Sequence, residues 1–342
     1  MTVGMIRNRL HASIPFRIKP GARRGIAGMA SRRMVLFAVF AVSAPALAQR
    51  RIAPPPPSSR PTLPEALNRT LDREFSHRSG AGVVVDVRSG RILAAKNIPV
   101  AARRLALPGS SIKPFVLYEL LESGKLRPNE AFVCPYKLTI DGHRLDCTHP
   151  ENTGPMTPAA ALAYSCNNFF ARMGMRLTPA ELAHALAQWG FTSPSRLTGN
   201  ELAGEIVAPR TPGELQLEAL GEYGIHVTPL ELLQAYRRLA ARRRDPAARN
   251  PALGVVFQGL EASVQYGMAS AAKTEGLRVA GKTGTARADE GAWTHGWFAG
   301  YAPADAPEIA LVIFLERGRG PMDAAGIARA VFTAYRDSRV LW

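Results

Sequence analysis

A serine and a lysine three residues apart stand at the predicted start of a helix and could form an activated nucleophile. Ser110 and Lys113 precede an apolar helical run, 115–121, and side chains at this spacing share one helix face. A hydroxyl would therefore lie beside an amine that can take its proton. The same spacing recurs at Ser270–Lys273, where we expect only a solvated surface. One Ser-x-x-Lys pair arises by chance about once in a chain of this length.

Two further motifs make the first pair more specific. Residues 165–167, Ser-Cys-Asn, form the only Ser-x-Asn motif, and residues 282–285, Lys-Thr-Gly-Thr, lie on a predicted strand. They follow the first pair in the order Ser-x-x-Lys, Ser-x-Asn, Lys-Thr-Gly. The pair at Ser270 lies after the Ser-x-Asn motif and has no such context. The three motifs together favour Ser110 over Ser270 as a nucleophile activated by a lysine.

The elements that must position these residues can be predicted from residue patterns. Alternating and β-rich runs predict strands. Thr-Pro pairs that begin at 157, 178, 211 and 228 predict helix starts. In the last three of these pairs a glutamate follows three residues after the threonine, as in a capping box. We expect an α/β fold of the α+β type, in which a five-stranded antiparallel sheet is flanked by helices and accompanied by an all-helical lobe. The expected elements are a helix over 62–75, strands over 82–88, 91–96, 279–286, 293–301 and 308–315, mostly helices over 110–276, and a last helix over 327–334.

The first 61 residues are predicted to lie outside the folded domain. Arg32 and Arg33 precede nine apolar residues and a small-x-small site that ends at Ala48, which is the order of a secretory signal. The apolar run is shorter than the roughly 20 residues of a membrane span. We therefore expect an export segment over 1–48 with cleavage after Ala48, a proline-rich linker over 49–61, and one domain over 62–342, its helical lobe inserted at about 114–250. The protein would be periplasmic or extracellular.

The net charge and the cysteines limit which partners and cofactors can be expected. The net charge of +16 falls to +8 without the eight basic residues of positions 1–48, so nucleic acid is not expected as a partner. Cys134 and Cys147 could form a disulfide in an exported domain or remain two buried thiols, and Cys166 is expected to pack unpaired. The spacing of the cysteines and histidines shows no metal-ligand pattern, so neither a metal nor a cofactor is expected.

The chain resembles the penicillin-binding transpeptidases over most of residues 80–342. The resemblance rests on the hairpin 82–96, the stretch 108–115 (Pro-Gly-Ser-Ser-Ile-Lys-Pro-Phe), residues 165–170, 227–232 and 281–286, and the segment 295–303 (His-Gly-Trp-Phe-Ala-Gly-Tyr-Ala-Pro). The family fold is a five-stranded antiparallel sheet with flanking helices and a helical lobe. This agrees with the fold expected from the residue patterns.

The resemblance also implies roles for the first two motifs. Ser110 would be the nucleophile that a D-Ala-D-Ala peptide acylates, and Lys113 would accept its proton. Ser165 would relay a proton to the leaving amine, while Asn167 would hold the substrate amide and Lys113. A second cation nearby would help to keep Lys113 neutral.

The third motif would bind the substrate. Lys282 would supply positive charge near the substrate carboxylate, and Thr283 and Thr285 would donate hydroxyl hydrogen bonds, with Gly284 between them. The backbone N–H groups of Ser110 and Thr285 would form the oxyanion hole.

We accordingly predict an exported serine D,D-transpeptidase that cross-links peptidoglycan stem peptides and binds penicillin and other β-lactams covalently, with cell-wall synthesis proteins as further partners. A D,D-carboxypeptidase or endopeptidase would differ only in using water as acceptor. A β-lactam sensor, a β-lactamase-like enzyme and a catalytically silent wall-binding module remain alternatives. One departure is Gly221-Glu222-Tyr223, where the family often has Gly-Gln-Gly; it predicts a changed pocket wall or acceptor path.

Overall fold

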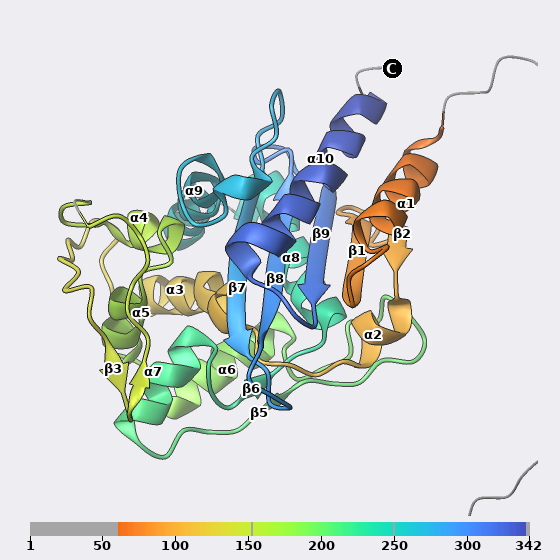
Figure 1. Ribbon diagram of the computed structural model, residues 1–342. Helices are drawn as coiled ribbons and strands as arrows, with labels where there is room; N and C mark the ends of the chain where they lie inside the picture. Colours follow the sequence, from red (N-terminus) through yellow and green to blue (C-terminus); the bar gives the residue numbers. More distant parts are fainter. Residues whose placement is uncertain (1–60, 152, 249, 340–342) are drawn as a thin grey trace, which may run out of the picture. The chain divides into compact units, whose positions relative to one another are not determined.

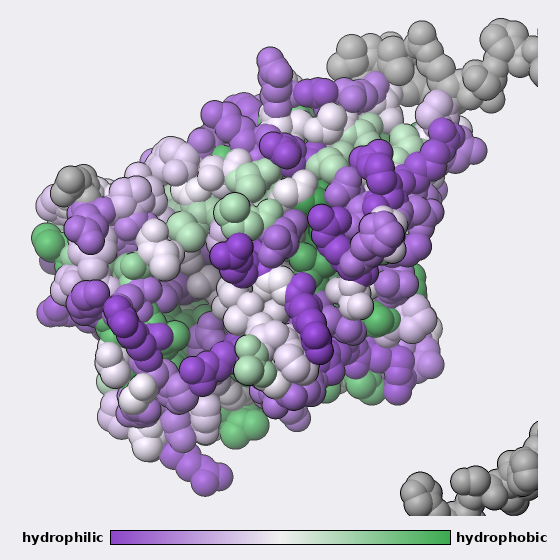
Figure 2. All heavy atoms as spheres, in the orientation of Figure 1, coloured by the Kyte–Doolittle hydropathy of each residue, from purple (hydrophilic) through white to green (hydrophobic). Residues whose placement is uncertain are grey.

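The computed structural model describes residues 61–151, 153–248 and 250–339. The predicted export segment, and the predicted linker except for residue 61, lie outside this part of the chain. Among the helices described, none is both long and apolar enough to cross a membrane. On the face drawn in Figure 2, hydrophilic side chains predominate and hydrophobic ones form small patches.

One antiparallel sheet of five strands organises the domain (Figure 1). Its order is β2-β1-β9-β8-β7, so strands from the two ends of the domain meet in its middle, with Gly80 opposite Leu315. This confirms the predicted sheet, and each strand lies within about two residues of its expected range. The strands are β1 (Gly80–Asp86), β2 (Ile92–Lys96), β7 (Ala280–Arg287), β8 (Thr294–Ala302) and β9 (Ile309–Leu315).

Both faces of the sheet are buried by helices. The strand β9 is buried at every position: Leu311 and Ile313 pack into one apolar cluster, and Val312 and Phe314 pack into another. Residues alternate between the two faces because the side-chain period of a strand is two. The first cluster lies under α1 (Leu63–Glu74) and α10 (Ala325–Arg339), and the second under α8 (Pro229–Arg244). Figure 1 shows α10 across the sheet with α1 beside it.

Between β2 and β7 the chain is mostly helical, and Figure 1 places much of this segment to one side of the sheet. Capping boxes are present at Thr178, Thr211 and Thr228, as the residue pattern predicts. The helices are α2 (Ile98–Arg103), α3 (Lys113–Glu122), α4 (Pro158–Ala163), α5 (Asn167–Gly174), α6 (Pro179–Trp189), α7 (Pro212–Leu220), α8, α9 (Pro251–Gln265) and the short turns η1 (Gly109–Ile112), η2 (Pro246–Ala248), η3 (Ser270–Ala272) and η4 (Gly320–Ala324).

The expected helical stretch is interrupted where the chain forms the rim of the site. Residues 123–157 are largely irregular and carry a small hairpin, β3 (Thr139–Ile140) and β4 (His143–Arg144). A second short pair joins β5 (Glu205–Ile206) to β6 (Ile225–His226). The interruption was not predicted, because two-residue strands carry too little periodicity to detect.

Candidate active site

Ser110 lies on a short helical turn, η1, that is fastened at both ends. The Gly109 amide donates a hydrogen bond to the Gly221 carbonyl at 2.9 Å, and the buried Tyr236 hydroxyl donates to the Ser111 carbonyl at 2.8 Å. Ser110 itself is half-buried and lines a cavity of about 690 Å³. The backbone that carries this serine is therefore held in place while its side chain borders open space.

The same cavity is lined by side chains from three separate parts of the chain. Ser165 and Asn167 come from the loop before α5 and its first turn, Thr283 and Thr285 come from β7, and Glu222 follows α7. Lys113 and Lys282 are fully buried beside this wall. The tertiary structure thus gathers the three sequence motifs into one site.

Lys113 is held by the Ser-x-Asn motif. Its Nζ donates hydrogen bonds to the Asn167 side-chain oxygen at 2.6 Å, to the Ser165 carbonyl at 3.0 Å and to Ser165 Oγ at 3.3 Å. The Asn167 amide in turn donates to the Leu145 carbonyl at 3.0 Å, which fixes its orientation. In the neutral form the amine has only two N–H donors, which the Ser165 carbonyl and the Asn167 side-chain oxygen satisfy, so its lone pair is left for the contact with Ser165 Oγ.

Ser165 lies between two lysines. Lys282 Nζ donates to Ser165 Oγ at 2.8 Å, opposite the contact from Lys113, and also donates to the Thr283 carbonyl at 3.0 Å. Ser165 has a φ of 55°, in the left-handed region that a non-glycine residue rarely adopts. This conformation marks the serine as held in an unusual position, as functional residues often are.

Burial lowers the pKa of both lysines. Desolvation brings the pKa of Lys113 to about 8, and it brings the pKa of Lys282 well below its usual value, with the charge of Lys113 acting in the same direction. Desolvation thus disfavours the charged form of both amines. For Lys113 this favours the neutral form that a base needs. For Lys282 the lowered pKa works against the positive charge that was predicted near the substrate carboxylate.

Gly284 explains how η1 and β7 come so close. A Cβ at this position would overlap the Pro108 carbonyl oxygen at the start of the Ser110 turn, so only glycine allows the contact. The next residue, Thr285, accepts a hydrogen bond at its Oγ1 from the Gly320 amide at 3.0 Å. The oxyanion hole expected from the backbone N–H groups of Ser110 and Thr285 stays a prediction.

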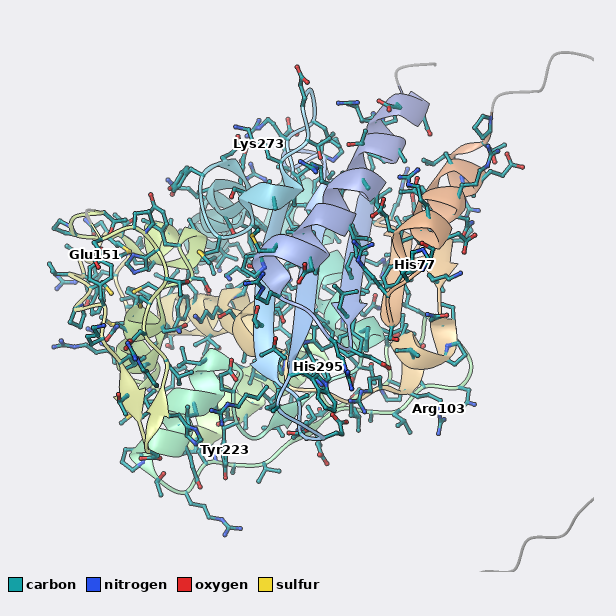
Figure 3. All side chains as sticks on the ribbon, viewed as in Figure 1. His77, Arg103, Glu151, Tyr223, Lys273 and His295 are labelled. Atoms are coloured by element: carbon teal, nitrogen blue, oxygen red, sulfur yellow. The ribbon has the colours of Figure 1, made fainter. Side chains whose placement is uncertain are left out.

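Glu222 is a cavity residue to which no role was assigned from the sequence. Burial raises its pKa to about 7, against the opposing influence of Lys113. Its segment is marked by the neighbouring Tyr223 in Figure 3. The only sequence signal was its place in the stretch that departs from the resembled family. Arg144 and Arg319 also border the cavity and were likewise missed, because neither belongs to a motif.

Other sequence expectations can be placed on the structure. Ser270 and Lys273 are both exposed at η3 and do not line the cavity, as expected of a solvated surface; Lys273 is labelled in Figure 3. The disulfide considered for Cys134 and Cys147 is not formed: both are free thiols, with their Sγ atoms 3.6 Å apart. Cys166 is also a free thiol, as expected, and its Sγ lies 3.8 Å from that of Cys147.

Comparison with known proteins agrees with this geometry. A family model described as the penicillin binding protein transpeptidase domain matches residues 80–335. Stage V sporulation protein D of Bacillus subtilis is 27% identical over 272 residues, covering 68% of this chain and 42% of that protein. The peptidoglycan D,D-transpeptidase FtsI of Escherichia coli is 26% identical over 304 residues, covering 74% of this chain and 51% of that protein. The chain thus spans about half the length of such curated relatives.

Solved structures show the same fold. The transpeptidase domain of Burkholderia pseudomallei penicillin-binding protein 3 matches with a TM-score of 0.70 at 21% identity, covering 84% of this chain and 98% of that one. A peptidoglycan glycosyltransferase of Burkholderia ambifaria matches with a TM-score of 0.69 at 24% identity, covering 82% and 94%. With the family model matching most of the described domain, the chain belongs to the penicillin binding protein transpeptidase domain family.

Proposed function

We propose that this protein is a serine D,D-transpeptidase. Its Ser110 is acylated by the D-Ala-D-Ala stem peptides of peptidoglycan. The observation that supports this most directly is the contact set of Lys113, whose buried amine meets Ser165 Oγ and the Asn167 amide beside the cavity that Ser110 lines. Relatives named as peptidoglycan D,D-transpeptidases support the substrate class.

The first half-reaction forms an acyl-enzyme. Ser110 Oγ attacks the carbonyl carbon of the penultimate D-Ala, and its proton passes to Lys113 Nζ. The described contacts of Lys113 do not include Ser110, so the two groups must approach once substrate enters the cavity, as is common for catalytic hydrogen bonds. The tetrahedral intermediate then collapses: the C–N bond breaks, and the proton reaches the departing D-Ala amine through Ser165 Oγ.

The second half-reaction transfers the acyl group to the acceptor and regenerates the free Ser110 hydroxyl. The amine of a second stem peptide attacks the acyl carbon, a new amide bond forms as the ester bond between that carbon and Ser110 Oγ breaks, and the proton lost by the amine passes through Ser165 and Lys113 to Ser110 Oγ. The two lysines on either side of Ser165 suit this relay, because burial makes both ready to give up a proton. A β-lactam would form the first acyl bond in the same way and remain attached.

The acylation site can be identified directly. We expect a labelled penicillin to attach to Ser110 and not to Ser270, because only Ser110 lines the cavity beside Lys113. Proteolysis and mass spectrometry of the labelled protein locate the adduct. Ser270→Ala serves as the matched control and should label at the wild-type rate. An adduct on Ser270, or none on either serine, would contradict the assignment.

Glu222 favours a second candidate function, D,D-carboxypeptidase activity. Its carboxyl lines the same cavity as Ser110 and has a pKa near 7, so it is partly ionised at neutral pH and can take a proton from a nearby water. Water activated in this way would attack the acyl carbon and release the shortened peptide. The balance between cross-linking and hydrolysis would then depend on this one side chain.

Replacing Glu222 should change the product ratio. Glu222→Gln keeps the shape but removes the base, so we expect the ratio of hydrolysed to cross-linked product to fall at least about tenfold, while penicillin labelling persists. A defined stem peptide with and without an amine acceptor, followed by product analysis, measures the ratio. Glu218→Gln is the matched control, since Glu218 is a buried carboxyl that does not line the cavity. An unchanged ratio in Glu222→Gln would exclude this role.

We also propose that the protein is exported to the periplasm or the cell exterior, where stem peptides, β-lactams and cell-wall synthesis proteins would be its partners. The support is the signal-like order of residues 32–48. The mature chain is then expected to begin near Gln49. N-terminal sequencing of protein from extracytoplasmic and cytosolic fractions tests this. An intact N-terminus on protein confined to the cytosol would refute it.

A further inference from the structure

The three cysteines of the chain converge with a histidine directly behind the Ser-x-Asn motif. Cys134, Cys147, Cys166 and His149 offer three sulfur atoms and one ring nitrogen that all lie within 4.8 Å of one another. The Cys147 sulfur is 3.6 Å from that of Cys134 and 3.8 Å from that of Cys166. In a tetrahedral zinc site with Zn–S bonds of about 2.3 Å, neighbouring sulfurs are about 3.8 Å apart. The sulfur spacing is therefore that of a tetrahedral metal site.

The hydrogen bonds of His149 point independently to a ligand at its ring nitrogen. His149 is 4% exposed, and its Nδ1 lies 3.0 Å from the Pro150 carbonyl. A carbonyl can only accept, so Nδ1 carries the proton and Nε2 keeps a free lone pair. Nε2 is buried with no hydrogen-bond partner among the described residues. Metal-binding histidines are typically oriented in this way, with the other ring nitrogen donating to a backbone carbonyl.

The surroundings of the sulfurs also suit thiolates. The Asn168 side-chain amide donates to the Cys147 sulfur at 3.4 Å, and the Tyr136 backbone amide donates to the Cys134 sulfur at 3.3 Å. Such N–H donors to ligand sulfurs are common around metal sites. Simple packing of three thiols would leave the buried Nε2 of His149 without a hydrogen-bond partner, which is unfavourable. A Cys134–Cys147 disulfide would leave both the histidine and Cys166 without a partner.

We propose that Cys134, Cys147, His149 and Cys166 bind one zinc ion that fastens the wall of the active site. The set of three thiolates and one imidazole in a closed, tetrahedral arrangement is typical of structural zinc. Such a site has no open position, so the metal takes no part in the acyl transfer. None of the three spacings between successive ligands is that of a common zinc motif, which is why the sequence did not predict the site.

The position of the ligands shows what the metal would hold. Cys166 stands between Ser165 and Asn167, the two residues that contact Lys113. The other three ligands belong to the loop over 134–149, whose Leu145 carbonyl accepts the hydrogen bond from Asn167. Glu151, labelled in Figure 3, follows this loop beside α4 and α5. The ion would thus tie the loop to the motif that positions the proton relay, and the ligands act as positioning residues.

Metal analysis of the purified full chain tests the site without an activity assay. We expect one zinc per chain by elemental mass spectrometry, and a sulfur-to-metal charge-transfer band after exchange with Co²⁺. All three cysteines of the chain are ligands, so thiol labelling should rise from none to three per chain when a chelator removes the metal. His149→Ala should lose the metal, whereas His77→Ala, at an exposed histidine, should keep it.

Reversible removal of the metal tests the link to catalysis even where a ligand variant fails to fold. The rate of penicillin acylation should fall about tenfold or more in the chelated wild-type protein and recover when Zn²⁺ is added. Stoichiometric metal with an unchanged rate would confirm the ligands but overturn the link to Ser165. Protein without metal, with no Co²⁺ band and with reactive thiols or a Cys134–Cys147 disulfide, would overturn the site. The metal content, the Co²⁺ band and the thiol labelling do not depend on Ser110, so a failure of the zinc site can be distinguished from a failure of the proposed transpeptidase activity.

Discussion

Lys113→Arg is expected to slow acylation by a labelled penicillin at least about 10²-fold, the loss that follows when general-base assistance disappears. The lysine amine contacts Ser165 and Asn167 and is fully buried, and its pKa is lowered to about 8 by desolvation. It can therefore be neutral at the moment of attack. A guanidinium does not lose its proton in proteins, so arginine keeps the charge and abolishes the base.

The wild-type rate should depend on pH in the direction that this role requires. The base form of Lys113 is neutral, so acylation should rise as the pH increases through about 8 and should be slow when the amine is protonated. Lys282 and Glu222 also titrate near the same cavity and will broaden the profile. In Lys113→Arg the rise should disappear, which separates loss of a base from a merely structural defect.

Two other lysines provide matched comparisons. Lys273→Arg changes the exposed lysine of the second Ser-x-x-Lys pair and should label at the wild-type rate. Lys282→Arg keeps a cation beside the substrate but must fit a buried site next to Ser165, so we expect slower yet measurable labelling, and a larger loss in Lys282→Ala. Thermal melting checks that each variant is folded. A folded Lys113→Arg that labels as fast as wild type would refute the serine–lysine mechanism.

Gly284→Ala is expected to reduce acylation about 10²-fold although it alters no catalytic group. The added methyl would overlap the Pro108 carbonyl, so β7 and the turn that carries Ser110 would have to separate. A displacement of about 1 Å at a reacting group costs about 10²-fold in rate. The cost in folding free energy should be smaller, about 1–3 kcal/mol, as for other overpacked positions.

Gly254→Ala is the control for this prediction. Gly254 lies within α9, and a Cβ there would contact nothing within 4 Å. Alanine should therefore leave acylation unchanged and raise the melting temperature slightly, because it favours helix by up to about 1 kcal/mol. Rates with labelled penicillin and melting curves distinguish the two positions. Normal labelling in Gly284→Ala would show that the turn tolerates displacement.

The local elements of this protein were already determined by its sequence. Thr178, Thr211 and Thr228 begin helices where each threonine is followed by proline and, three residues on, by glutamate, because a capping box is made within one turn. The strands were predictable because burial on a pleated sheet imposes its own residue pattern. The three motifs were recognisable for the same reason: each is a short segment whose residues act within one turn or one strand.

Only the tertiary structure decided how segments that are distant in the sequence surround each residue of the site. Burial shifts the pKa of Lys282 and of Glu222, and burial depends on α7, β7 and the loop over 134–149 packing around one cavity. The grouping of Cys134, Cys147 and Cys166 with a histidine was likewise not readable from their spacing, because an irregular loop brings them together. Desolvation and ligand geometry are properties of three-dimensional surroundings, so a one-dimensional pattern of residues could name the participants but not set their charges or their contacts.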